Sequence, residues 1–247
     1  MKPRGGGVTL LANLFSSEKV YATTGTFYPD ADPETSTVDG WVYQYTEYDT
    51  FQNLRAATGN YAQPSSQDGQ LGIETVGTPS TDYFTSIIRA ITLFNTSSLG
   101  SDAVISGGTI SLYGYSKMNT LGGTAGLILV GVSPNSNTDL ITSDYGIGNY
   151  TLTNYGGISY SSFSTSGYNN ITINANGLAV ISKTGITKYA QLMTDDFNNS
   201  FSGVWIAGGY DRTDYYFSEA AGTSQDPKLV VTYTLPANPK QDVIWFD

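Results

Sequence analysis

The stretch SIIRAITLFNTSSLGSDAVISGGTISLYGYSK, residues 86–117, decides the fold together with DPKLVVTYT, residues 226–234. From Ile87 to Leu93 the apolar residues first run together and then alternate, and the pattern stops at Asn95, a residue type that bonds nearby backbone and ends strands. A second strand pattern follows at Ile110 to Tyr113, and residues 229–233 (LVVTY) are mostly β-branched or aromatic. These stretches predict two strands joined by a turn and a third strand near the C-terminus.

Further strand patterns recur at the spacing of an antiparallel sandwich. The predicted strands cover residues 41–45, 71–76, 83–94, 109–115, 125–132, 170–173, 187–193, 204–207, 215–218 and 228–235, with a loop at 59–69. Residues 50–57 fit a strand or one helical turn. Short connecting helices are predicted at 139–145, capped by Asn137 and Thr138, and at 175–182, capped by Asn174.

Together these elements predict an all-β fold, an antiparallel jelly-roll β-sandwich with one or two short connecting helices and extended terminal segments. A sandwich of 247 residues is often a single domain. We expect an N-terminal arm or docking segment at residues 1–27, the jelly-roll domain at 28–235 and a C-terminal tail at 236–247, after Pro236 interrupts the strand pattern.

Four segments carry a resemblance to a known family: RAITLFNTSSL (89–99), AVISGGTISLYGYSK (103–117), GLAVISKTGITKYAQL (177–192) and AGTSQDPKLVVTYT (221–234). The chain resembles the DNRLRE-type jelly-roll domains of phage-derived structural proteins and secreted surface proteins over residues 30–234. It departs from them at Asn95, where the family usually has Asp, and at Gly107 and Gly108. The resemblance implies a jelly roll with a structural, adhesive or carbohydrate-associated role and no common catalytic apparatus.

The composition argues against several classes of partner. The net charge is −10, and the eleven basic residues form no cluster larger than Lys2 and Arg4, so nothing predicts the basic face that nucleic acid requires. No segment approaches the roughly 20 apolar residues of a membrane span. The apolar run at 8–15 follows two early positive charges, but Asn13 interrupts it and three glycines precede it, which favours an arm over a secretory signal.

The chain has no cysteine and no histidine. It therefore has no disulfide, no thiolate nucleophile and no Cys-type zinc site. Without histidine, no side chain has an unperturbed pKa between pH 5 and 8, so the composition argues against a pH switch in that window.

Acidic residues give the candidates for catalysis and for metal binding. Local pairs occur at Glu47 and Asp49, at Asp195 and Asp196, and at Asp211 and Asp214, but we expect solvated loop acids there and predict no enzyme. No G-x-S-x-G elbow is present. Calcium prefers the oxygen ligands that Asp-rich turns supply, so the candidate calcium ligands are Asp30, Asp32, Asp39, Asp195 and Asp196.

Tyrosines give the candidate glycan contacts, because an aromatic ring can pack on a sugar while its hydroxyl and neighbouring polar groups bond the sugar's hydroxyls. The candidates are Tyr155, Tyr168, Tyr210, Tyr215 and Tyr216. The alternative interpretation is that these rings fill the space between the sheets or between subunits.

The two ends carry apolar residues outside the predicted jelly roll, and such residues mark contacts when they are exposed. The predicted capsid or subunit contacts are Val8, Leu10, Leu11, Leu14, Phe15, Val243, Ile244, Trp245 and Phe246. The sequence therefore predicts a virion surface protein, either a capsid decoration protein or a head or tail fibre module, that binds capsid or tail proteins and forms a homo-oligomer such as a trimer. The alternative is a carbohydrate-binding or adhesive module at a cell surface or in the extracellular space.

Overall fold

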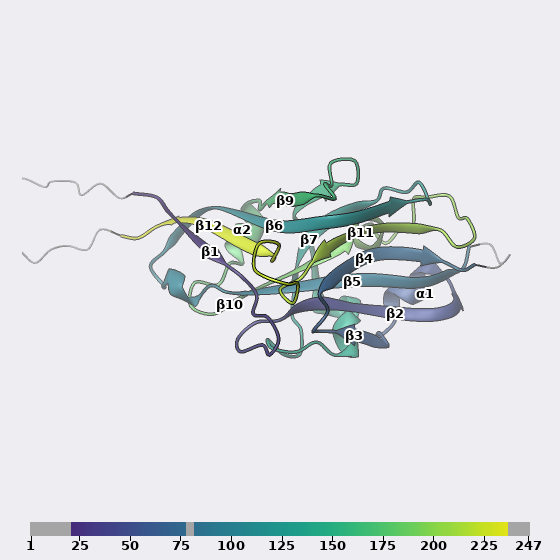
Figure 1. The fold of residues 1–247 in the computed structure, drawn as a ribbon, viewed down its shortest axis with the longest axis horizontal. Coiled ribbons are helices and arrows are strands. Elements are labelled where there is room, and N and C mark those ends of the chain that lie inside the picture. The colour runs from purple at the N-terminus through teal and green to yellow at the C-terminus, as the bar shows by residue number, and fades with distance from the viewer. Residues whose placement is uncertain (1–20, 78–81, 237–247) are drawn as a thin grey trace, which may run out of the picture.

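The structure is a computed structural model, and it describes residues 21–77 and 82–236 (Figure 1). Within these residues the chain forms strands β1 Thr23–Phe27, β2 Asp39–Asp49, β3 Tyr61–Gln63, β4 Asp68–Thr75, β5 Phe84–Asn95, β6 Val104–Asn119, β7 Gly126–Val132, β8 Tyr150–Ser159, β9 Gly167–Thr172, β10 Ile186–Met193, β11 Tyr210–Tyr216 and β12 Lys228–Thr234. Short α-helices lie at α1 Phe51–Ala56, α2 Ala175–Ala179 and α3 Thr194–Asn198, and 3-10 turns at η1 Ser97–Leu99, η2 Thr142–Tyr145 and η3 Ile147–Asn149.

The described strands pair antiparallel, and the long strands β5 and β6 shape the sheet. Along one edge β5 pairs with β2, while its other edge pairs first with β4 and then with β10. In the same way β6 pairs with β9 on one edge and with β12 and then β11 on the other. Because each long strand changes partner halfway, the sheet β1-β12-β6-β11-β4-β5-β10-β7-β8 divides and curls into a jelly-roll-like sandwich. The predicted all-β fold is confirmed.

The core follows from the alternation of side chains along these strands. Ile91 and Leu93 of β5, Ile110 and Leu112 of β6, and Leu229 of β12 have no exposed surface. They belong to one hydrophobic cluster. Burying each such side chain contributes about 1.5–3 kcal/mol before entropy costs, so the stretches that define the strands also supply the packing energy.

Strand β1 brings the two ends of the described chain together. It pairs with β12 from Thr23 opposite Tyr233 to Phe27 opposite Leu229. Figure 1 shows β1 and β12 side by side at one end of the molecule. Residues 23–27 were predicted as part of the arm, but they pair with the last strand and belong to the sheet.

Most strand predictions are confirmed, but three local predictions are wrong. Residues 204–207 form no strand. Val204 is 73% exposed, so its apolar side chain does not pack against the sheet. The helix at 139–145 is reduced to η2, which begins after Ile141. The loop at 59–69 contains β3, which pairs with β2. The structure agrees with the predictions for two connecting segments. Residues 51–56 are helical, and the Asn174 side chain caps α2 by accepting from the Gly177 N–H.

Within residues 21–77 and 82–236, the helices are too short and too polar to cross a bilayer.

Candidate functional site

The candidate site is one face of the sheet across strands β9, β6, β11, β4, β5, β2 and β3, which follow one another from top to bottom in Figure 1. Residues paired across antiparallel strands point to the same face. The register places Tyr168 beside Tyr113, Tyr216 beside Asp68, and Tyr43 beside Tyr61. We call this surface the outer tyrosine face; its members are Tyr168, Tyr113, Tyr115, Tyr216, Asp214, Arg212, Tyr210, Asp68, Gln70, Glu74, Trp41, Tyr43, Tyr45 and Tyr61.

One group of rings lies at the β9 and β6 side of this face. Tyr113 meets Tyr168 edge to face with ring centroids 5.3 Å apart, and Tyr115 lies 4.8 Å from Tyr216. The Tyr115 hydroxyl donates to the Asp68 carboxylate at 3.0 Å. A β-bulge between β6 and β11 beside Asp214 and Tyr215 brings Tyr115 next to Tyr216. These contacts hold the rings in fixed orientations.

A second group of rings lies at the β2 and β3 edge. Tyr43 and Tyr61 stack with centroids 4.5 Å apart, and Trp41 lies 4.9 Å from Tyr43. Tyr45 and Tyr61 are each 43% exposed, so their rings are open to solvent. Partial burial raises the pKa of Tyr43, and the nearby Tyr61 and the Glu74 carboxylate raise it further. The second group therefore lies close to Glu74 of β4.

Polar side chains lie between the two groups of rings. Arg212 Nε is 3.0 Å from Asp214 Oδ2. Burial raises the pKa of Asp214 to about 6, although the Arg212 charge opposes this shift. The Arg212 side chain lies over Gly72, where an added Cβ would be 3.2 Å from Arg212 Cγ. Gly72 therefore lets the guanidinium lie along the sheet between the tyrosines.

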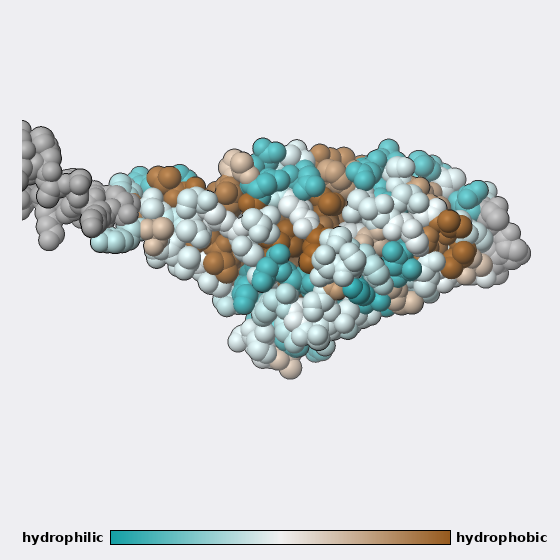
Figure 2. All heavy atoms as spheres, turned by 90° about the horizontal axis from the view of Figure 1, so that it is seen from above, coloured by the Kyte–Doolittle hydropathy of each residue, from teal (hydrophilic) through white to brown (hydrophobic). Residues whose placement is uncertain are grey.

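The chemistry of this face is that of binding. Rigid aromatic rings offer flat apolar area with polar edges, and a guanidinium with carboxylates and amides supplies directional hydrogen bonds. Figure 2 views the molecule from above, at a right angle to Figure 1, and that side likewise shows apolar residues in separate patches among hydrophilic ones. Groups of these two kinds can contact a ligand that combines polar groups with flat apolar patches.

The structure separates the five predicted glycan contacts. Tyr168 and Tyr216 lie on the outer tyrosine face, and the Tyr210 ring lies there 5.9 Å from the Arg212 guanidinium. Tyr155 and Tyr215 are buried, so the prediction is wrong for them. Tyr215 points inward because it neighbours Tyr216 on one strand, and its hydroxyl donates to Gln191 Oε1 at 2.9 Å.

Sequence reasoning missed six of the aromatic residues on this face. They are Tyr113, Tyr115, Trp41, Tyr43, Tyr45 and Tyr61. The signal was available, because WVYQY at 41–45 places an aromatic residue at every second position. That spacing indicates one aromatic face of a strand, and it was interpreted as an ordinary strand pattern.

The predicted calcium ligands do not assemble into one site. Within the two described ranges, no three acidic side chains group closely enough to hold a metal ion. Asp30 Oδ2 accepts instead from the backbone and hydroxyl groups of Thr35 and Ser36, and these bonds lower its pKa against the effect of burial. Asp39 is fully buried beside Ser218, and Asp32 lines a nearby cavity.

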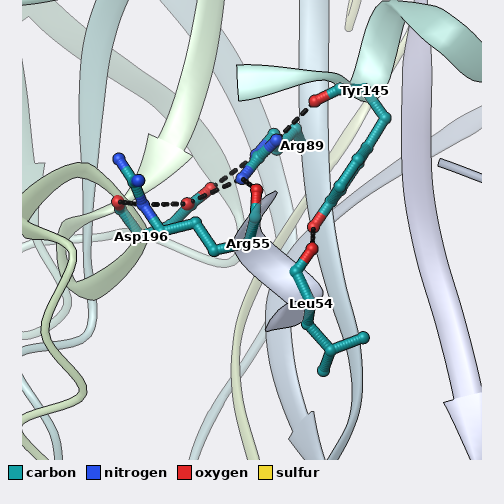
Figure 3. A network of polar contacts seen from close by, with 5 residues as sticks. All are labelled: Leu54, Arg55, Arg89, Tyr145 and Asp196. Atoms are coloured by element: carbon teal, nitrogen blue, oxygen red, sulfur yellow. Dashed lines mark hydrogen bonds and ion pairs between the residues drawn. The ribbon is translucent and has the colours of Figure 1, made fainter. Parts of the chain in front are cut away.

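Asp196 belongs to a buried polar network rather than to a solvated loop (Figure 3). Arg89 of β5 has no exposed surface, and its Nε and Nη2 donate to the two Asp196 oxygens at 2.7 and 2.9 Å. Arg89 also donates to the backbone carbonyls of Tyr145 and Arg55, and the Tyr145 hydroxyl donates to the Leu54 carbonyl. This network ties α1, η2 and α3 to β5, so its role is structural.

Three of the other acids that were expected to be solvated, Asp195, Asp211 and Asp214, are also paired. Asp195 accepts from the Ser202 hydroxyl at 2.8 Å, and Asp211 accepts from the Leu121 N–H at 3.2 Å. Both Asp195 and Asp211 are buried, as is Asp214. The expectation of solvated loop acids is therefore wrong for Asp195, Asp196, Asp211 and Asp214.

The predicted capsid or subunit contacts at 8–15 and 243–246 lie outside the described residues. Comparison with known proteins adds no identification, because no protein-family model matches the chain and a search of curated proteins finds no significant match. The resemblance to DNRLRE-type domains therefore stays a prediction.

Proposed function

We propose that this protein is a non-enzymatic structural protein of a virion surface, a capsid decoration protein or a head or tail fibre module held by its terminal segments. The observation that carries the proposal is the pairing of β1 with β12, because it places the two ends of the described chain side by side at one end of the sandwich. Anchoring at that end leaves the outer tyrosine face and the far loops free. Capsid or tail proteins, or sister subunits in a trimer, are the proposed partners.

Removing the anchoring segments is expected to separate attachment from folding. Deletion of residues 1–15 or 241–247 should change the melting temperature by less than about 4 °C, which corresponds to about 1 kcal/mol for a chain of this size. Binding to the parent particle should weaken at least about tenfold, or 1.4 kcal/mol. Co-sedimentation of each purified variant with particles that lack the protein measures this.

The matched control keeps the length of the tail and its apolar residues. Asp242→Asn with Asp247→Asn should bind like the wild type, whereas serine at the four positions 243–246 should behave like the deletion. A collapse of the melting temperature with unchanged binding per folded molecule would show that the ends are core elements.

A second candidate function is glycan binding, and the outer tyrosine face favours it. The face combines two groups of oriented rings with the Arg212 and Asp214 pair between them. Under this proposal the protein is a carbohydrate-binding or adhesive module of a virion, a cell surface or the extracellular space. The two functions are compatible, because the described chain begins and ends beside the β1–β12 pairing at one end of the sandwich, while the face lies along the sheet.

Replacing rings on the face is expected to weaken glycan binding. Tyr61→Ala and Tyr216→Ala should each lower affinity about 2- to 12-fold, since an aromatic contact contributes about 0.5–1.5 kcal/mol beyond its buried area. A glycan array identifies the ligand, and titration calorimetry measures the change. Tyr21, which is 76% exposed and outside the face, provides the control variant Tyr21→Ala. No binding on the array, or equal losses in all three variants, would contradict this function.

A further inference from the structure

Ser218 lies at the centre of a cluster that joins two distant segments, the loop that leads into β2 and the connection between β11 and β12. Its hydroxyl oxygen is 3.0 Å from the Asp30 carbonyl oxygen and 3.1 Å from Glu219 Oε1, and it makes a short contact with Asp39 Oδ1. The Ser218 N–H donates to Asp39 Oδ2 at 3.1 Å. We call Asp39, Ser218, Glu219 and Asp226, with Asp32 and Glu34 beside them, the acid clasp.

The hydrogen count at Ser218 is the first step. A serine hydroxyl carries one hydrogen and can donate once. Three oxygen atoms surround it, and two of them belong to the carboxyl groups of Asp39 and Glu219. If both carboxyl groups were ionised, the one hydroxyl hydrogen could be donated to only one of these three oxygens. A proton on Asp39 or Glu219 turns that carboxyl group into a donor and supplies a second hydrogen to the cluster.

The second step is the burial of carboxylate oxygens without partners. Glu34 Oε1, Glu219 Oε2 and Asp226 Oδ1 are buried and accept no hydrogen bond. Asp226 is 6% exposed and lines a cavity of about 520 Å³ together with Asp32 and Glu219. Burying an unpaired charge costs several kcal/mol, so a carboxyl group in such a place holds a proton instead. The cavity gives water a route for proton exchange.

The third step is the sign of the surrounding charges. The titratable groups around the clasp come from the preceding loop, β2, the loop before η2, β9, β11 and the β11–β12 connection, and they are Asp30, Asp32, Glu34, Asp39, Asp139, Tyr168, Tyr215, Glu219 and Asp226. All of these groups are acids, and the nearby cation is Lys228 of β12, whose Nζ lies 3.8 Å from the centre of the Tyr168 ring. The ion pairs among the described residues involve Asp196 and Asp214, so none compensates this cluster.

We propose that the acid clasp holds at least one proton at neutral pH, shared between Asp39, Ser218 and Glu219, and that its loss in mildly alkaline solution loosens the contact between residues 30–39 and 217–227. This is a pH-sensitive junction within the fold, and it is independent of the proposed virion role. A proton fits better than a metal ion, because no three of the described acids are close enough to coordinate one.

The direction of the pKa shifts agrees with this junction. Burial raises the pKa of Asp39 well above its usual range, and the Glu219 charge raises it further. Burial raises the pKa of Glu219 to about 7. The folded chain therefore keeps protons that the unfolded chain loses near pH 4, since ordinary carboxyl pKa values lie at about 4. Because the folded state binds more protons between about pH 4 and about pH 7, the contribution of Glu219 to stability falls as pH rises through this window.

The test needs a signal from the clasp itself, because overall stability also depends on pH through Asp211 and Asp214. Burial raises the pKa values of these two groups to about 6. The Ser218 amide signal in ¹H–¹⁵N NMR should titrate with a midpoint near the Glu219 value of about 7. In Glu219→Gln this transition should disappear or move, and the loss of melting temperature between about pH 5.5 and about pH 8.5 should shrink. Glu47→Gln, at an exposed acid, is the matched control and should behave like the wild type.

Two results would overturn the proposal. A Ser218 signal that does not titrate between about pH 5 and about pH 9 would show that the clasp exchanges no proton there. A rise in melting temperature on adding calcium chloride at alkaline pH, lost in both Glu219→Gln and Asp226→Asn, would show that a cation and not a proton compensates the cluster. If Glu219→Gln does not fold, Asp226→Asn carries the NMR test, and a Ser218 midpoint lowered in it supports the proposal.

Discussion

Asp196→Ala is expected to lower the free energy of unfolding by about 3–5 kcal/mol, because removing one partner of a buried ion pair leaves the other charge uncompensated. Arg89, the stranded partner, has no exposed surface, and its guanidinium carbon lies 4.0 Å from the centre of the Tyr145 ring. For a chain of this size the loss corresponds to a fall in melting temperature of about 6–20 °C. Urea unfolding followed by circular dichroism measures it.

The matched control is the more exposed ion pair of the outer tyrosine face. Arg212→Ala removes the partner of Asp214, but the Arg212 side chain is 22% exposed and Asp214 can take up a proton near pH 6. We therefore expect a smaller loss than in Asp196→Ala, because protonation removes the uncompensated charge of Asp214. Arg89→Met should cost less than Asp196→Ala, because Asp196 keeps Arg55 at 3.2 Å and no guanidinium is left buried without a partner. Equal losses in Asp196→Ala and Arg212→Ala would contradict the structural role of the network.

Gly114→Ala is the second change with a large expected effect. An added Cβ at Gly114 would lie 2.1 Å from the Ser164 carbonyl oxygen and 2.6 Å from the Phe163 ring. The segment around Ser164 is held by Asn169, whose side chain accepts from the Ser164 N–H and donates to its carbonyl. The backbone must therefore shift, and we expect a loss of about 1–3 kcal/mol or more, as in overpacked cores. Thermal unfolding measures the loss.

Gly107 lies on the same strand and provides the control. An added Cβ there would be 3.6 Å from the Thr232 side chain, which is an ordinary contact. Because glycine in a strand costs about 0.5–1 kcal/mol relative to alanine, Gly107→Ala should leave stability unchanged or raise it slightly. If Gly114→Ala and Gly107→Ala had the same melting temperature, the close contact at Gly114 would not be the cause of a loss of stability. Gly114→Ala should also weaken the binding of any ligand to the outer tyrosine face, because Tyr113 and Tyr115 flank this position.

The sequence alone determined the fold class and most of the strands. Apolar residues that run together and then alternate at 87–93, and β-branched and aromatic residues at 229–233, predicted strands. The structure has β5 there, buried on both faces, and β12. The absence of cysteine and histidine likewise determined which chemistries the chain lacks. These properties are local, since period and residue type depend on neighbours along the chain.

Tertiary structure decided which side chains meet, because their partners are far apart in sequence. Asp39 lies 179 residues from Ser218, and Arg89 lies 107 residues from Asp196. The absence of histidine argued against a pH-sensitive group between pH 5 and 8, but burial raises the pKa of Glu219 to about 7. A carboxyl group acquires such a pKa from loss of water and from neighbouring charges, and both depend on the packed fold. In the same way, strand alternation separates Tyr215 from Tyr216, but only the packing of the sheets decides that Tyr215 is the buried one.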